Sequence, residues 1–168
     1  GKIIPLDLTD MGGQIIAQRD AFLCAAKGIQ IEIAFQKNVG VGLFGGEGFI
    51  MQKLIGDGLT FLHAGGTIIE KELAPGEIMK FDTGCLVAMT STINYNVEMV
   101  GSIKSAFFGG EGLFLATLKG PGHVWLQSIP FSRLANRMYQ AATKSGSKSK
   151  GERSVIRGIG IGDLFGKD

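Results

Sequence analysis

The chain has 168 residues, of which 45% are hydrophobic, and a formal net charge of +2. This length suits one domain, or two small fused halves that share a core. Residues 144–168 hold 6 Lys/Arg against 3 Asp/Glu, whereas residues 1–143 hold 11 against 12, so the charge balance argues against a broad nucleic-acid surface. The sequence shows no signal peptide and no run of ~18 uncharged apolar residues, so no membrane span is predicted.

The 27 glycines follow no collagen period and separate short apolar runs, which is typical of an all-β protein with many turns. Residues 1–10 are expected to form an edge or a linker, because Pro5 cannot donate a ladder hydrogen bond. Cys24 and Cys85 lie within apolar runs and are predicted to be buried free thiols, as in a reducing cytoplasm. Further strands are expected at residues 14–18, 21–26, 30–35, 49–55, 59–64, 67–73, 78–81, 85–90, 93–100, 113–118 and 123–129.

One motif, Phe-Gly-Gly-Glu-Gly, occurs twice, at residues 44–48 and 108–112, which are 64 positions apart. The correspondence continues without a gap, so we predict an internal duplication with repeats near 44–64 and 108–128. In the first copy a Gly-Asp-Gly turn at residues 56–58 separates two strands, and a Gly-Pro-Gly turn does so in the second. Each pair of strands is therefore predicted to form a β-hairpin.

The C-terminal part of the chain has a different pattern. Apolar residues recur at helical spacing near residues 131–142, the single helix that the sequence predicts. Residues 1–143 are expected to form the duplicated all-β domain, a β-sandwich or double-stranded β-helix. Ser, Gly and Lys dominate the sequence that follows, so residues 144–168 are expected to be a flexible basic tail with a short apolar end.

The two copies of the motif supply the candidate ligand-binding residues. Glu47 and Glu111 are expected at equivalent places, where two carboxylates can share a proton or bind a cation, or can accept hydrogen bonds from turn N–H groups instead. Gly46 and Gly110 offer backbone N–H groups to a phosphate, or serve only to allow a positive φ. A nucleotide loop is not indicated, because no Lys-Ser/Thr follows either glycine.

The sequence contains no recognisable catalytic or metal-binding constellation. His63 and His123 lie in predicted strands without clustered carboxylates, so neither a metal site nor a cofactor is predicted. The serines lack the context of a nucleophile elbow, and we do not expect an enzyme. Phe61 and Trp125 are aligned across the two copies and are predicted to pack in the core.

A family resemblance is carried by Ala74-Pro75-Gly76-Glu77, by residues 115–117, 120–122 and 125–135, and by the doubled motif. Over roughly residues 10–140 the chain resembles bacterial and archaeal relatives, of unknown function, of the mitochondrial biogenesis family named for altered inheritance of mitochondria. The resemblance implies a fold similar to the trp RNA-binding attenuation protein, all β and internally duplicated. It implies members that are longer at the N-terminus and no catalytic residues, and fold alone does not transfer RNA binding.

The favoured function is that of a non-catalytic, oligomeric scaffold or interaction protein in the cytoplasm, with an unidentified protein partner. Strands 59–64 and 113–118 are apolar on both faces, and one short helix cannot cover two sheets, so a homo-oligomer is expected. The fold resemblance implies a ring or trimer rather than a dimer. The alternative is a small-ligand or lipid-binding module with an apolar pocket. A cupin-like enzyme fits less well, because the turn at residues 75–77 is present but the His-x-His ligands are missing.

Overall fold

The computed structural model describes residues 1–37, 49–99, 114–135, 137–139 and 141–142. Both copies of the Phe-Gly-Gly-Glu-Gly motif and the predicted tail lie outside the described residues. The chain divides into two compact units, residues 1–133 and residues 134–168. Everything that follows concerns the first unit, apart from the short helix that crosses the boundary and comprises residues 131–135, 137–139 and 141–142.

The predicted all-β class is confirmed. The strands are β1 (Lys2–Asp7), β2 (Gln14–Gln18), β3 (Phe22–Ala25), β4 (Gln30–Lys37), β5 (Phe49–Ile55), β6 (Leu59–Ala64), β7 (Ile68–Leu73), β8 (Ile78–Asp82), β9 (Leu86–Thr90), β10 (Asn94–Met99), β11 (Phe114–Lys119) and β12 (Gly122–Gln127). Three short 3-10 turns, η1 (Thr9–Met11), η2 (Arg19–Ala21) and η3 (Thr83–Cys85), connect some of them. The predicted bounds of β2, β5 and β6 agree with the structure to the residue, because a short apolar run bounded by turn residues is a local signal.

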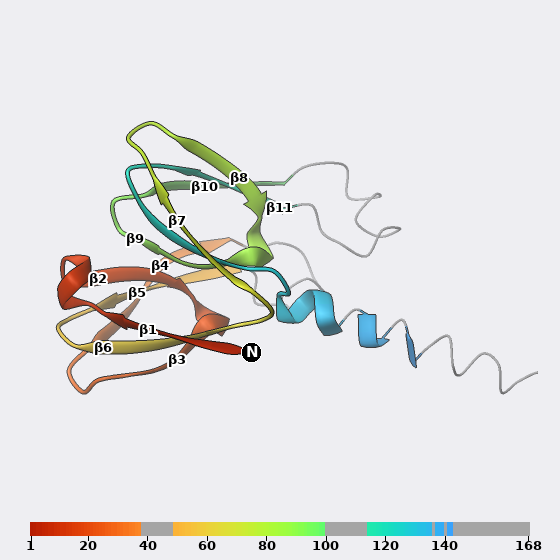
Figure 1. Ribbon diagram of the computed structural model, residues 1–168, viewed down its shortest axis with the longest axis horizontal. Helices are drawn as coiled ribbons and strands as arrows, with labels where there is room; N and C mark the ends of the chain where they lie inside the picture. The colour runs from red at the N-terminus through yellow and green to blue at the C-terminus, as the bar shows by residue number, and fades with distance from the viewer. Residues whose placement is uncertain (38–48, 100–113, 136, 140, 143–168) are drawn as a thin grey trace, which may run out of the picture. The chain divides into compact units, whose positions relative to one another are not determined.

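Three antiparallel sheets are stacked in this unit. The middle sheet has six strands in the order β4-β5-β2-β9-β12-β7. The three-stranded sheet β1-β6-β3 packs on one face, and the three-stranded sheet β10-β11-β8 packs on the other (Figure 1). The central strands of the middle sheet are therefore covered on both faces, which explains why β2 and β9 are buried along nearly their whole length.

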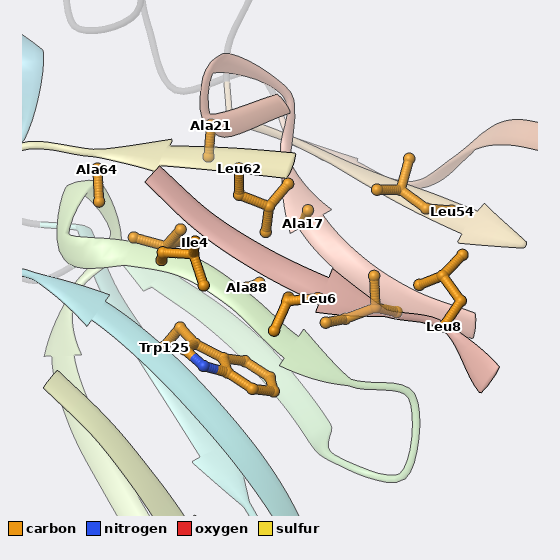
Figure 2. Close-up of a cluster of buried hydrophobic side chains, with 12 residues drawn as sticks. Ile4, Leu6, Leu8, Ala17, Ala21, Leu54, Leu62, Ala64, Ala88 and Trp125 are labelled. Carbon is orange, nitrogen blue, oxygen red and sulfur yellow. The ribbon is translucent and has the colours of Figure 1, made fainter. Parts of the chain in front are cut away.

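Two hydrophobic cores fill the spaces between the three layers. The core on the side of β1-β6-β3, here called the Trp125 core, contains Ile4, Leu6, Leu8, Ile15, Ala17, Ala21, Leu54, Leu62, Ala64, Val87, Ala88 and Trp125 (Figure 2). The core on the side of β10-β11-β8, here called the Phe49 core, contains Ile16, Phe49, Met51, Leu73, Leu86, Met89, Ile93, Val97, Leu118, Val124 and Leu126. Consecutive side chains of a strand point to opposite faces, so Ile15 and Ala17 of β2 enter one core and Ile16 enters the other.

The two predicted hairpins are wrong. β5 pairs with β4 and β2 in the middle sheet, whereas β6 pairs with β1 and β3 in a different layer. β11 and β12 are separated in the same way. The turns themselves are present, since Gly56, Gly58 and Gly122 all have positive φ angles. A reversal of direction does not decide the partner, and here the chain passes from one layer to the next instead of folding back on its own strand.

Several strand pairings of the first half recur in the second half with residue numbers raised by 64, whereas the pairing of β7 with β12 is shifted by one residue from that of β1 with β6. The bulged pairing Phe22–Leu62, Cys24–Phe61, Ala25–Thr60 of β3 with β6 becomes Leu86–Leu126, Ala88–Trp125, Met89–Val124 of β9 with β12. The pairings Gln14–Ile55 and Gln30–Ile55 become Ile78–Lys119 and Asn94–Lys119. Strands β2 and β3 therefore correspond to β8 and β9, and this correspondence is used below.

The turn between β7 and β8 has the expected chemistry. Gly76 has a φ of 80°, and the Glu77 N–H donates to the Ala74 carbonyl at 2.9 Å. The Glu77 carboxylate accepts from Lys71 Nζ at 2.7 Å and from the Ala74 N–H at 2.9 Å. The hydrogen bond from Lys71 first, and then that from Ala74, lower the pKa of Glu77 below its ordinary value of 4.5.

Replacing Glu77 by Gln is expected to lower the melting temperature slightly at pH 7, and this effect should shrink as the pH falls below 4.5. The pKa is lower in the folded state, so the carboxylate stabilises the fold above pH 4.5 and loses this contribution as the pH falls through the folded-state pKa. The measurement is a pair of thermal melts at each pH. Asp57→Asn, which removes an exposed carboxylate from the β5–β6 connection, is the control and should show no such trend. An effect of Glu77→Gln that is as large at acid pH as at pH 7 would contradict this account.

Candidate interaction surface

The sequence-predicted ligand residues Glu47, Gly46, Glu111 and Gly110 lie outside the described residues, so their role as a site stays a prediction. In the described ranges, no group of three or more His, Cys, Asp or Glu side chains is placed to hold a metal ion. The structure instead draws attention to the histidines, the cysteines and the edges of the sheets.

His123 has carboxylate neighbours that the sequence analysis did not expect. Its Nδ1 lies 3.9 Å from Glu70 Oε1, and its Nε2 lies 3.9 Å from Glu72 Oε1. The antiparallel register of β7 with β12 brings the three together, and the ring also stacks on Trp125 at a centroid distance of 6.1 Å. All three polar side chains are substantially exposed, so these are weak surface contacts. The other histidine, His63, is exposed and pairs with Ile3.

The prediction of two buried thiols is wrong for Cys24 and only half right for Cys85. Cys24 is exposed, because β3 lies at the edge of its sheet and this side chain does not point into the core. Cys85 is half-buried, and burial, reinforced by the charge of Asp82, raises the pKa of its thiol. Both cysteines are free. Cys24 is therefore the accessible thiol of the pair.

The edge strands differ in how they are protected against pairing with another chain. Edge strands usually carry charges or proline, which disfavour such pairing. Proline lies in β1, while charged side chains are present in β4, β7, β8 and β10. The remaining edge strand, β3, has the sequence Phe22-Leu23-Cys24-Ala25 and carries neither a charge nor a proline. β3 is thus the unprotected edge among the strands that the structure describes.

The outward face of the sheet β1-β6-β3 is largely apolar at its centre. The inward side chains, such as Leu6 and Leu62, are buried in the Trp125 core. The apolar outward ones are Ile3 and Pro5 on β1, Leu59 and Phe61 on β6, and Cys24 on β3, while Asp7 and His63 lie at the margins of the same face. Ile3 is 61% exposed and Leu59 is 45% exposed. We call these five apolar residues together with Leu23, which is 50% exposed, the β3 surface. An exposed apolar face of this kind is typical of a site that binds another molecule.

The comparisons with known proteins agree with this all-β architecture. Residues 1–129 match the family described as Mitochondrial biogenesis AIM24. The chain belongs to this family. Within the described ranges, moreover, no helix of the AIM24 domain is long and apolar enough to cross a membrane.

Two Streptococcus pyogenes proteins are similar to this AIM24 domain. An uncharacterized protein of serotype M6 is 28% identical over 141 residues, which cover 82% of this chain and 54% of the relative. An X-ray crystal structure of a S. pyogenes protein superposes with a TM-score of 0.70 at 23% identity, covering 84% of this chain and 60% of that one. The second likeness concerns the fold alone. The chain thus spans somewhat more than half the length of either relative.

Proposed function

We propose that this AIM24 domain is a non-catalytic interaction protein that self-associates and serves as a scaffold for a protein partner. The observation that carries the proposal is the β3 surface, which joins an unprotected sheet edge to an exposed apolar face. Burying apolar surface contributes about 25 cal/mol per Å², so covering such a face favours association. The free thiols of Cys24 and Cys85 support a reducing location such as the cytoplasm.

The choice of a second copy as the first partner rests on the chemistry of the surface. A surface specialised for nucleic acid carries clustered Lys and Arg, whereas the six residues of the β3 surface carry no charge. Apolar, uncharged interfaces are typical of permanent homo-oligomers, in which the surface is never exposed for long. A further protein partner then binds the assembled form.

Light scattering coupled to size exclusion, on the purified chain at micromolar concentration, tests this proposal. We expect a molar mass that is a multiple of 17.8 kDa and that decreases on dilution or stays constant if the assembly is tight. A mass of one chain at every concentration would overturn self-association. It would also leave the β3 surface without the function assigned to it here.

A further inference from the structure

The two halves of the chain are joined by a pairing between one strand of each half. The strands that correspond to these two elsewhere in the chain are edge strands of their sheets. Inside the chain, β2 pairs antiparallel with β9 through Ile15–Thr90, Ile16–Met89 and Ala17–Ala88. This junction is buried, since Ile15, Ala17, Ala88 and Met89 are all 0% exposed. It merges the strands of two halves into the six-stranded middle sheet.

The correspondence of 64 residues shows which strands lack this partner. β2 corresponds to β8, and β9 corresponds to β3. Both β8 and β3 are edge strands in the described chain, at the ends of two different sheets. Each copy therefore has two edge strands, β3 in its first half and β8 in its second half, that correspond to the two strands of the internal β2–β9 junction.

The face formed by β9 and β12 and the corresponding face formed by β3 and β6 are both apolar, but they differ in burial. Val87, Ala88 and Trp125 are 0%, 0% and 2% exposed, because side chains of the first half cover them in the Trp125 core. Figure 2 shows Trp125 and Ala88 in one cluster with Ile4 and Leu6 of β1.

Their counterparts, 64 residues earlier, are Leu23, Cys24 and Phe61. Leu23 is 50% exposed, Cys24 is exposed and Phe61 is half-buried, although all three are as apolar as the buried set. The first half thus carries an apolar face that, among the described residues of a single chain, remains exposed to water.

We propose that β8 of one copy pairs antiparallel with β3 of a second copy and repeats the internal β2–β9 junction. Shifting the internal pairs by 64 residues, which carries β2 onto β8 and β9 onto β3, predicts the intermolecular pairs Met79–Ala26, Lys80–Ala25 and Phe81–Cys24. The covering surface is the second half of the neighbouring copy, whose Met79 and Phe81 already pack against the Phe49 core. This inference rests on the self-association proposed above and specifies its geometry.

Such an interface is heterologous, because the two surfaces in contact are different. Each copy has one β3 edge and one β8 edge, so copies add head to tail and the assembly closes into a ring if the rotation at each junction permits. A two-fold dimer, in contrast, would place the same edge of both copies in contact. The β3–β3 and β3–β8 arrangements bring different residues together, which makes them separable by experiment.

Cysteine cross-linking tests the register, with Cys85→Ala included to remove the second thiol. Directly opposite residues of antiparallel strands have Cα atoms about 4.5–5.5 Å apart, which lies within the range that a disulfide tolerates. We expect Phe81→Cys to form an intermolecular disulfide with the native Cys24 when the oxidant diamide takes up the two electrons and the two thiol protons and is reduced to its hydrazine. The readout is a reducible ladder on a denaturing gel and the linked peptides in mass spectrometry.

The matched control is Lys80→Cys in the same background. Position 80 is exposed, so its thiol is the more accessible of the two in random collisions. Its side chain faces the other side of the sheet and lies opposite Ala25, so it should cross-link poorly with Cys24. Equal cross-linking of both variants would overturn the register.

Phe81 is half-buried, and its replacement can weaken the fold. A second pair avoids this: Lys80→Cys with Ala25→Cys, in a background with Cys24→Ser and Cys85→Ala. These positions are directly opposite in the proposed register, and neither belongs to the core clusters. An intermolecular disulfide between them supports the proposal, and its absence in a folded, oligomeric variant overturns it.

Leu23→Glu tests the surface without cross-linking. Because Leu23 is half exposed, the folded chain tolerates the charge, but the proposed junction would bury it, and we expect at least a tenfold weaker association. The control is Ile31→Glu on β4, at 47% exposure, which should leave association unchanged. An oligomer that forms without either cross-link and resists Leu23→Glu would overturn β3–β8 pairing and assign the β3 surface to another occupant. A strictly monomeric chain would overturn the proposed function as well.

Discussion

Trp125→Ala is expected to cause one of the largest losses of stability available by a single substitution in this chain. The indole is 2% exposed and lies in the Trp125 core, between the sheet β1-β6-β3 and the middle sheet. Removing a buried tryptophan side chain costs about 3–5 kcal/mol, through lost burial and the cavity that remains. For a unit of this size the melting temperature should fall on the order of 10–20 °C.

The measurement is urea denaturation followed by far-UV circular dichroism, because Trp125 is the single tryptophan and its fluorescence is lost in the variant. Phe131→Ala is the matched control. Phe131 is 80% exposed, so its truncation should change the free energy of unfolding by less than about 0.5 kcal/mol. If the two variants lose similar amounts of stability, the Trp125 core does not hold the layers together as described.

Gly122→Ala is expected to be comparably damaging, for a reason that concerns the backbone. Gly122 has a φ of 150°, and a Cβ atom there would meet Thr90 Oγ1, with Thr92 Oγ1 at 2.7 Å and Ile93 Cγ1 at 2.9 Å. Thr90 Oγ1 also accepts the His123 N–H at 3.0 Å, and its β-branched side chain moves aside with difficulty. Backbone strain and overpacking together should cost about 2–5 kcal/mol.

Gly76→Ala separates these two contributions. Gly76 also has a positive φ, at 80°, but no atom lies within 4 Å of the position that a Cβ would take. Its replacement should therefore cost only the backbone term, about 1–2 kcal/mol. Chemical denaturation of both variants gives the comparison. Equal losses would show that crowding by the two threonines contributes nothing, contrary to the packing described here.

Local features of this chain were predictable from its sequence because their causes are local. Short apolar runs bounded by Gly- and Asp-containing turns placed β2, β5 and β6 correctly. The Ala74–Glu77 turn was predicted as well, since it needs only Pro at one position and a glycine free to adopt a positive φ. The number of strands in each sheet, in contrast, has no such local cause.

Which strands pair with one another was decided by the tertiary structure. The Gly-Asp-Gly turn at residues 56–58 reverses the chain equally well in a hairpin and in a passage between layers, so the pattern of β5 and β6 could not distinguish them. What separates them is the packing of distant apolar faces: β5 is held between β4 and β2, and β6 between β1 and β3. The register of β7 with β12, which places Glu70 and Glu72 beside His123, depends on the same long-range contacts.

The candidate surface shows the same division most clearly. Phe61 and Trp125 occupy equivalent positions in the aligned sequence. Each pairs across its sheet with the corresponding small residue, Cys24 or Ala88. The sequence by itself determined that both aromatic side chains belong on an apolar face of a strand. Only the tertiary structure decided that the face of Trp125 is covered by the first half of the chain, whereas among the described residues the face of Phe61 is not covered. Coverage depends on which layer packs against each face, and the pattern of residues along a strand does not specify this.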